Sequence, residues 1–194
     1  MIPEGFFENR LVYFAQGKRS KIYTFMKGRK RFAVKVEDEK SGAFARLENE
    51  VRFLKRLKKY NIGPKVVKCG GGFMAYEFVE GMQILEFLKN TDNPVPVLKE
   101  ILRQCRVLDR LGINKLEMHH PLKHIFIKGE KVVMIDFERC YKTKKPKNVT
   151  QFCQFLLRCP CLKLEKEVFM KKIKKYKAGF SAKSFKELVE EVKC

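Results

Sequence analysis

The chain has 194 residues, 45% of them hydrophobic, so it can form one domain of ordinary size or two smaller units that share an interface. No apolar run approaches the roughly 20 residues of a membrane-spanning helix, and the N-terminal stretch lacks the basic-then-apolar pattern of a signal peptide. Forty-three Lys and Arg residues against 22 Asp and Glu give a net charge of +21, which favours polyanionic partners such as RNA.

The seven cysteines do not indicate a disulfide framework, because their number is odd and their spacing is irregular. Cys159 and Cys161 are one residue apart, but no second Cys or His pair lies at a zinc-like spacing. We interpret them as two small side chains beside a turn. Together with the bulk properties, this predicts a cytoplasmic protein that is not associated with a membrane.

The first third of the chain is predicted to form strands. Between Arg10 and Glu37, apolar segments are interrupted by "QGKRS" and "KGRK", which are typical of turns. A helix follows and should end near Pro64, because the residue before a proline avoids the helical region. Its apolar face is predicted from residues at helical spacing: Leu47, Val51, Leu54 and Leu57. Two further strands are predicted around the triple glycine of "KVVKCGGGFMAYEFVEG".

Helices dominate the rest of the chain. The stretch "VPVLKEILRQCRVLDRLGI" is predicted to be amphipathic, with Gly112 as its C-terminal cap. The stretch "LEMHHPLKH" is irregular, "IFIKGEKVVMIDF" is a hairpin, and three helices follow Val149. This order predicts an α+β protein with two lobes, which we place at 1–79 (strands and one helix) and 80–194 (mainly helices).

A lysine on a strand and a glutamate on the following helix are the first candidates for chemistry. Lys35 lies in the apolar strand "FAVKVE", on the face opposite to its valine neighbours. Glu50 lies on the apolar face of the helix, where a carboxylate is costly unless it is paired. We therefore expect an ion pair that orients the ammonium toward phosphate oxygens. The turn at Gly17 and Ser20 could cover phosphates with backbone amides, although a hairpin turn explains it as well.

These segments together resemble the protein kinase superfamily along almost the whole chain. "FAVKVE" is similar to the strand with the phosphate-binding lysine, and "LENEVRFLKRL" to the helix with its glutamate partner. "YEFVEG" resembles the hinge, and "IDFE" resembles the metal-binding Asp-Phe-Gly segment. A narrower resemblance, through "GKRSKIY", "PLKHIFI", "DFER" and "KNVTQF", is to RIO-like kinases, the compact kinase of tRNA threonylcarbamoylation, and a group of predicted archaeal Ser/Thr kinases. It implies a bilobal fold with a compact, truncated C-terminal lobe.

The resemblance implies that Mg-ATP binds between the two lobes. Lys35 and Glu50 would position the phosphates, and Asp136 would be the catalytic ligand of Mg²⁺. The backbone carbonyl of Glu77 and the N–H of Val79 would contact adenine, because an extended hinge leaves such groups for a ligand.

The residue after Asp136 and Phe137 departs from the family, since Glu138 stands where kinases have glycine. Glu138 could add a second oxygen ligand to the metal, or it could form a salt bridge with a nearby Lys or Arg. Loss of the glycine removes the residue that tolerates unusual backbone angles, so flipping of this segment should be restricted.

The catalytic loop departs further, because "NKLEMHHPLKHIFI" has no Asp, and no Asn after Asn114, at the family positions. Counted back from the next strand without a gap, His119 takes the Asp place and His124 takes the Asn place, as a candidate metal ligand. With a two-residue insertion, Glu117 takes the Asp place. Glu117 or neutral His119 could accept a proton or position a hydroxyl. Lys123 could replace a metal charge beside the transferred phosphate.

Three functions stay open at this point. The favoured one is an atypical ATP-dependent Ser/Thr protein kinase or ATPase that acts on a protein or on itself, on or near RNA and ribosomes. The alternative is a catalytically weak pseudokinase that binds RNA or ribonucleoprotein in a nucleotide-dependent way, with "HHPLKH" as a phosphate-contacting loop. The third is a small-molecule phosphotransferase similar to aminoglycoside kinases, but a basic surface argues against a cationic substrate.

Overall fold

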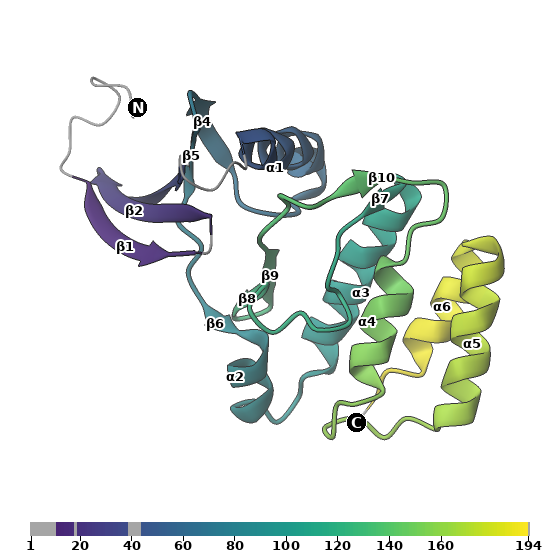
Figure 1. Cartoon of the computed structure of the whole chain (residues 1–194). Coiled ribbons are helices and arrows are strands. Elements are labelled where there is room, and N and C mark those ends of the chain that lie inside the picture. The colour runs from purple at the N-terminus through teal and green to yellow at the C-terminus, as the bar shows by residue number, and fades with distance from the viewer. Residues whose placement is uncertain (1–10, 18, 39–43, 194) are drawn as a thin grey trace. The chain divides into compact units, whose positions relative to one another are not determined.

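The computed structural model describes residues 11–17, 19–38 and 44–193, and Figure 1 labels its elements. Within these ranges it contains six α-helices and three sheets with antiparallel pairing, which confirms the predicted α+β class. The chain divides into two compact units, which we call the first and the second unit: Met1–Val79 with Met134–Arg139, and Glu80–Val133 with Cys140–Cys194.

The segment Met134–Arg139 belongs to the first unit, whereas the sequence analysis placed it in the second lobe. Its backbone is bonded to the helix of the first unit: the Phe137 N–H donates to Glu50, and the Glu138 carbonyl accepts from Asn49. These bonds join residues that are 87 and 89 positions apart, so no local sequence pattern could indicate them.

The first unit contains a five-stranded antiparallel sheet with the strand order β1-β2-β3-β5-β4. Its strands are β1 (Val12–Gln16), β2 (Ser20–Lys27), β3 (Lys30–Glu37), β4 (Val66–Gly70) and β5 (Phe73–Glu77). The turn from β4 to β5 is the predicted triple glycine. Gly71 and Gly72 have φ angles of 48° and 78° there, in the left-handed region that glycine adopts without steric cost.

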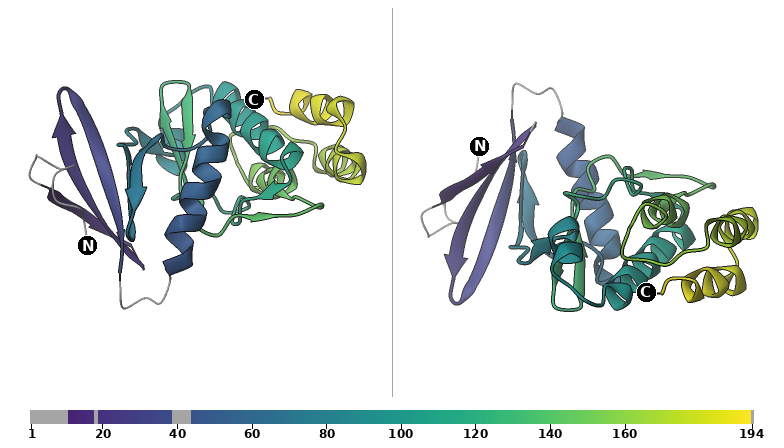
Figure 2. Two further views of the ribbon diagram at one scale, coloured as in Figure 1. Left: turned by 90° about the horizontal axis from the view of Figure 1, so that it is seen from above. Right: turned by 90° about the horizontal axis from the view of Figure 1, so that it is seen from below.

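Helix α1 (Phe44–Leu57) contacts β4 and β5, and both views of Figure 2 show it beside that end of the sheet. Its predicted apolar face is buried: Leu47, Val51, Leu54 and Leu57. Aromatic and aliphatic side chains of the strands form a core cluster: Phe25, Val34, Phe73 and Ala75. The helix ends as predicted, because a 3-10 turn η2 (Lys58–Tyr60) follows it and Asn61 has a left-handed φ of 55°.

The second unit combines helices with two small sheets of strand orders β6-β8-β9 and β10-β7. Its strands are β6 (Met82–Gln83), β7 (Ile113–Asn114), β8 (Ile125–Lys128), β9 (Lys131–Met134) and β10 (Tyr141–Lys142). Its helices are α2 (Ile84–Lys89), α3 (Val95–Arg110), α4 (Asn148–Leu156), α5 (Lys166–Gly179) and α6 (Ala182–Glu190). Among the described residues, no helix has both the length and the apolar character needed to cross a membrane.

The predicted hairpin is β8 with β9, and the three helices expected after Val149 are α4, α5 and α6. Gly112 follows α3 with a left-handed φ of 61°, as expected of a C-terminal cap. The elements α2 and β6 and the β10-β7 pair were not predicted, since segments of two to six residues carry too little periodicity.

A buried carboxylate in α3 organises the helices of the second unit. Asp109 accepts hydrogen bonds from the backbone N–H of Asn148 at 3.0 Å, from the Asn148 side chain at 2.7 Å and from the Tyr176 hydroxyl at 2.9 Å. Burial raises the pKa of Asp109, although these hydrogen bonds act in the opposite direction. Asp109 thus satisfies donors at the start of α4 and in α5, which serves the packing of this unit.

Candidate functional site

The predicted ion pair lies in the first unit and is nearly buried. Lys35 Nζ in β3 lies 2.7 Å from Glu50 Oε2 in α1, and the two side chains are 13% and 4% exposed. Burial lowers the pKa of Lys35, but the charge and hydrogen bond of Glu50, together with the charges of Asp136 and Glu138, outweigh burial, so the pKa is raised. Lys35 therefore stays a cation in a setting with little water, which strengthens its attraction for an anion.

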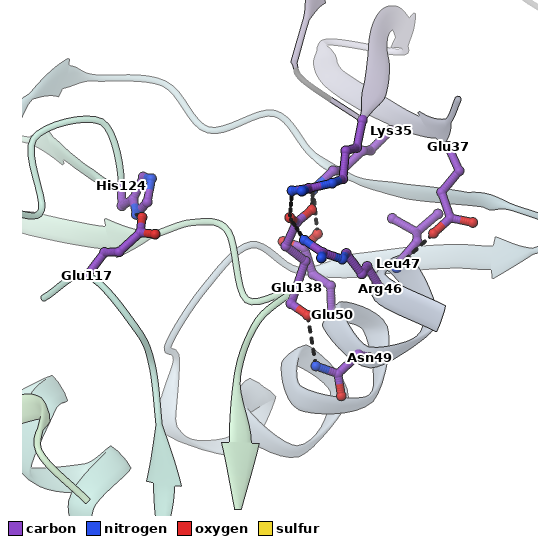
Figure 3. A network of polar contacts seen from close by, with 10 residues as sticks. Lys35, Glu37, Arg46, Leu47, Asn49, Glu50, Glu117, His124 and Glu138 are labelled. Atoms are coloured by element: carbon purple, nitrogen blue, oxygen red, sulfur yellow. Dashed lines mark hydrogen bonds and ion pairs between the residues drawn. The ribbon is translucent and has the colours of Figure 1, made fainter. Parts of the chain in front are cut away.

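The segment from Asp136 to Glu138 is bonded to α1 at two points, as Figure 3 shows in part. Glu50 Oε1 accepts the Phe137 N–H at 3.0 Å, and Asn49 Nδ2 donates to the Glu138 carbonyl at 2.9 Å. Glu50 thus uses one oxygen for Lys35 and the other for the backbone beside Asp136. The helix, the strand lysine and the Asp136 segment are held in one arrangement.

Asp136 has a φ of 64°, in the left-handed region where non-glycine residues are uncommon. This positive φ lies two residues before Glu138, and the expected restriction of flipping stays a prediction. Aspartate tolerates this conformation better than most residues, because its short polar side chain can bond locally. Strained backbone of this kind clusters at ligand-binding sites.

Glu138 forms salt bridges, the second of the two roles left open for it. Its carboxylate lies 3.5 Å from Lys35, 3.6 Å from Arg46 and 3.8 Å from Arg19. Figure 3 shows Lys35, Arg46 and Glu138 pointing toward one another. The glycine of the kinase pattern is thus replaced by a side chain that brings a negative charge among three cations.

The carboxylates could also hold a metal ion. One oxygen each from Glu50, Asp136 and Glu138 lies within 4.8 Å of the others, and no other such group of three exists among the described residues. An all-oxygen set suits Mg²⁺. Both oxygens of Glu50 accept hydrogen bonds, of 2.7 and 3.0 Å, whereas the ion pairs of Glu138 are 3.5 Å or longer, so Glu138 is the better ligand of the two. Cys159 and Cys161, with sulfurs 2.6 Å apart beside a turn, are not in this group.

The β1–β2 connection closes as a hairpin. The Gly17 N–H donates to the Ser20 carbonyl at 2.8 Å, so this amide is used within the turn and does not point at a ligand. Ser20 is buried at the start of β2. The structure therefore favours the hairpin explanation of this turn over a phosphate-covering role for the Gly17 amide.

The predicted hinge begins at the end of β5, where the pairing of β5 with β3 extends by one further hydrogen bond. The Glu77 N–H donates to the Lys65 carbonyl at 3.1 Å, and the Phe78 N–H donates to the Arg31 carbonyl at 3.0 Å. The Arg31 guanidinium lies 4.1 Å from the centre of the Phe78 ring, a cation–π contact that fixes the chain at this point. Contacts of the Glu77 carbonyl and the Val79 N–H with adenine stay a prediction.

The candidate catalytic loop lies in the second unit. Glu117 has a φ of 71°, and its carboxylate lies 3.9 Å from His124 Nδ1 (Figure 3). His119 and Lys123 are exposed, and the His119 carbonyl accepts a hydrogen bond from Arg158. Glu117 and His124 are thus brought together, while both alignments of the loop to the kinase pattern stay open.

Four residues near the ion pair were not predicted: Arg19, Arg46, Asn49 and Tyr76. Arg46 precedes Glu50 by one helical turn and therefore shares its face, a signal that the sequence did contain. Burial and the charge of Glu50 raise the pKa of Tyr76 to about 12, so Tyr76 stays a neutral phenol beside the pair. No sequence pattern marks Arg19.

No protein-family model matches the sequence, and no curated protein is similar to it at a significant level. The resemblance to kinases therefore stays an expectation from the order of short motifs in the sequence. Function has to be inferred from the chemistry of the residues around Lys35 and Asp136.

Proposed function

We propose that this protein binds Mg-ATP through its first unit and transfers the γ-phosphoryl group to a Ser or Thr hydroxyl of a protein, itself included, or to water. One observation carries the proposal. A nearly buried lysine is held by a helix glutamate, and the carboxylates of Asp136 and Glu138 lie next to it. A fixed cation beside clustered carboxylates matches the opposite charges of a phosphate chain and its metal ion.

In this proposal, phosphate binding and metal binding belong to different side chains. Lys35 binds phosphate oxygens and is positioned by Glu50, while Asp136 and Glu138 hold Mg²⁺. When bound, the metal neutralises charge that develops on the transferred group. The hydroxyl oxygen attacks the γ-phosphorus, the bond to the ADP oxygen breaks, and ADP leaves with that electron pair. The hydroxyl proton passes to a phosphate oxygen or to water.

Mg-ATP should bind the wild-type protein with a dissociation constant below about 1 mM, a typical range for nucleotide-using enzymes. Lys35→Met should weaken this binding at least tenfold, because it removes the central cation but keeps much of the side-chain volume. Lys65→Met serves as the control, since it removes an exposed lysine from the same unit. Calorimetric titration measures all three proteins. No heat at millimolar Mg-ATP from demonstrably folded wild type would contradict the proposal.

A second candidate function is a pseudokinase that binds RNA. Its support is the charge excess together with a basic surface of the first unit. An open hollow of about 600 Å³ at the end of α1 and in η2 is lined by four cations: Lys55, Arg56, Lys58 and Lys59. Cations grouped around a hollow suit a phosphate backbone, which binds by release of counterions.

Charge reversal of this basic surface should weaken RNA binding and flatten its dependence on salt. The variant carries three substitutions: Lys55→Glu, Lys58→Glu and Lys59→Glu. The control carries the same charge change on exposed positions of α5: Lys171→Glu, Lys174→Glu and Lys177→Glu. Filter binding of tRNA across a salt series should show a slope of log K against log salt that is less steep by about 2–3 in the variant alone. Equal losses in both proteins would indicate attraction by net charge only.

A further inference from the structure

Three cations from separate parts of the first unit converge on one carboxylate. Arg19 precedes β2, Lys35 lies in β3, and Arg46 lies in the first turn of α1. All three lie 3.5–3.8 Å from Glu138, whose side chain is 15% exposed. The fold therefore brings three positive charges to one place, although nothing in the local sequence groups them.

These contacts differ from the neighbouring Lys35–Glu50 pair. Charge-assisted hydrogen bonds are about 2.7–2.9 Å long, and Lys35 meets Glu50 at 2.7 Å. The contacts of Glu138 are all longer than that range, so its carboxylate is attracted by charge without a short bond to any of the three cations. Arg19 and Arg46 are also 33% and 38% exposed, so an anion from solution can reach them.

We propose that Arg19, Lys35 and Arg46 form an oligophosphate-binding site, and that Glu138 is an internal anion that occupies this site until the ligand displaces it. The ligand class is a chain of phosphate groups, either free or as part of a nucleoside triphosphate. A phosphate chain offers more oxygens than one carboxylate and can bond the guanidinium groups bidentately. This inference rests on the proposed function and names the residues of its phosphate subsite.

Glu138 then makes the site selective for the metal chelate over the metal-free chain. A metal-free oligophosphate displaces Glu138 and leaves its negative charge beside the ligand. When Mg²⁺ accompanies the phosphates, Glu138 gains a cation as partner, because its oxygen lies within 4.8 Å of one oxygen of Asp136. Neutralising Glu138 should therefore raise the affinity for the metal-free oligophosphate. It should also reduce the difference in affinity between the Mg²⁺ complex and the metal-free oligophosphate.

Inorganic tripolyphosphate, titrated with and without Mg²⁺ in a calorimeter, tests this role of Glu138. We expect Glu138→Gln to bind the metal-free chain at least tenfold more tightly than wild type, and to show a smaller gain on addition of Mg²⁺. Glu48→Gln is the matched control, because it makes the same charge change at an exposed position of α1 and should behave as wild type. If a folded Glu138→Gln protein binds tripolyphosphate without Mg²⁺ as tightly as wild type or more weakly, the proposal is overturned. Glu138 then serves only as a structural ion-pair residue.

The cations are tested by single substitutions. Arg19→Met and Arg46→Met should each weaken tripolyphosphate binding at least fivefold, whereas Arg29→Met, which removes an exposed charge from the turn between β2 and β3, should not. Equal effects of all three substitutions overturn the site, because binding then follows net charge. Thermal unfolding with and without ligand confirms that each variant is folded and reports the same order of affinities as a shift in Tm.

The failure of this inference and that of the proposed function are distinguishable. If tripolyphosphate binds with the expected dependence on Arg46 and Glu138 but Mg-ATP does not bind, the oligophosphate site stands and the kinase proposal falls. If Mg-ATP binds with the same affinity in Arg19→Met and Arg46→Met as in wild type, the kinase proposal stands and this site falls.

Discussion

Replacing Asp136 with Asn should lower the rate of phosphoryl transfer by about a thousandfold or more, since a metal ligand contributes several kcal/mol of charge stabilisation in the transition state. The carboxylate of Asp136 lies among the oxygens that could hold the metal, on a backbone fixed by the Phe137–Glu50 bond. Asn keeps the shape of Asp and tolerates the left-handed backbone at this position, so the variant should fold. Autophosphorylation and ATP hydrolysis measure the rate.

Asp92→Asn is the control, because it makes the same chemical change at an exposed loop position of the second unit. It should turn over ATP at the wild-type rate. An Asp136→Asn protein as fast as wild type means that Asp136 is not the catalytic metal ligand. If wild type binds nucleotide but does not turn it over, the result supports the pseudokinase proposal. The absence of an Asp in "LEMHHPLKH" then explains the missing turnover.

Removing Glu50 should be among the most destabilising substitutions in the first unit. Glu50→Ala leaves the Lys35 ammonium in a nearly buried place without its short hydrogen bond, and it leaves the Phe137 N–H without this acceptor. Breaking one side of a buried ion pair typically costs about 3–5 kcal/mol. Urea unfolding followed by circular dichroism measures the loss, and nucleotide binding should weaken with it because Lys35 loses its position.

A matched pair of variants separates this effect from a general loss of packing. Glu48→Ala, at an exposed position of α1, should change the free energy of unfolding by less than about 0.5 kcal/mol. The double variant Lys35→Met/Glu50→Leu replaces both charges with apolar groups and should be more stable than Glu50→Ala alone. A loss below about 1 kcal/mol in Glu50→Ala would mean that the pair is not structurally important.

Local patterns were sufficient to predict the Lys35–Glu50 pair. Helical spacing placed Glu50 on a buried face, and the cost of an unpaired carboxylate there required a cation, for which the preceding strand supplied Lys35. The strand before Asp136 was also predicted from its apolar run, although β9 ends at Met134, two residues before the carboxylate. Both inferences depend on periodicity within a few residues, which the sequence carries directly.

Long-range contacts were not predictable in the same way. The bond from Phe137 to Glu50 and the salt bridges of Glu138 with Arg19 and Arg46 join residues far apart in the sequence. Which element a charged side chain meets depends on the sheet order, in which β5 inserts between β3 and β4. The left-handed backbone of Asp136 was not predictable either, because aspartate tolerates that conformation but does not require it.

A crystal structure of the protein with Mn²⁺ and a non-hydrolysable ATP analogue tests the nucleotide site most directly, because the anomalous signal of Mn²⁺ locates the metal without reference to the rest of the map. The proposal predicts an anomalous peak about 2.0–2.3 Å from a carboxylate oxygen of Asp136, with phosphate oxygens bonded to Lys35. A nucleotide bound elsewhere, or a metal ion away from Asp136 and Glu138, would contradict it.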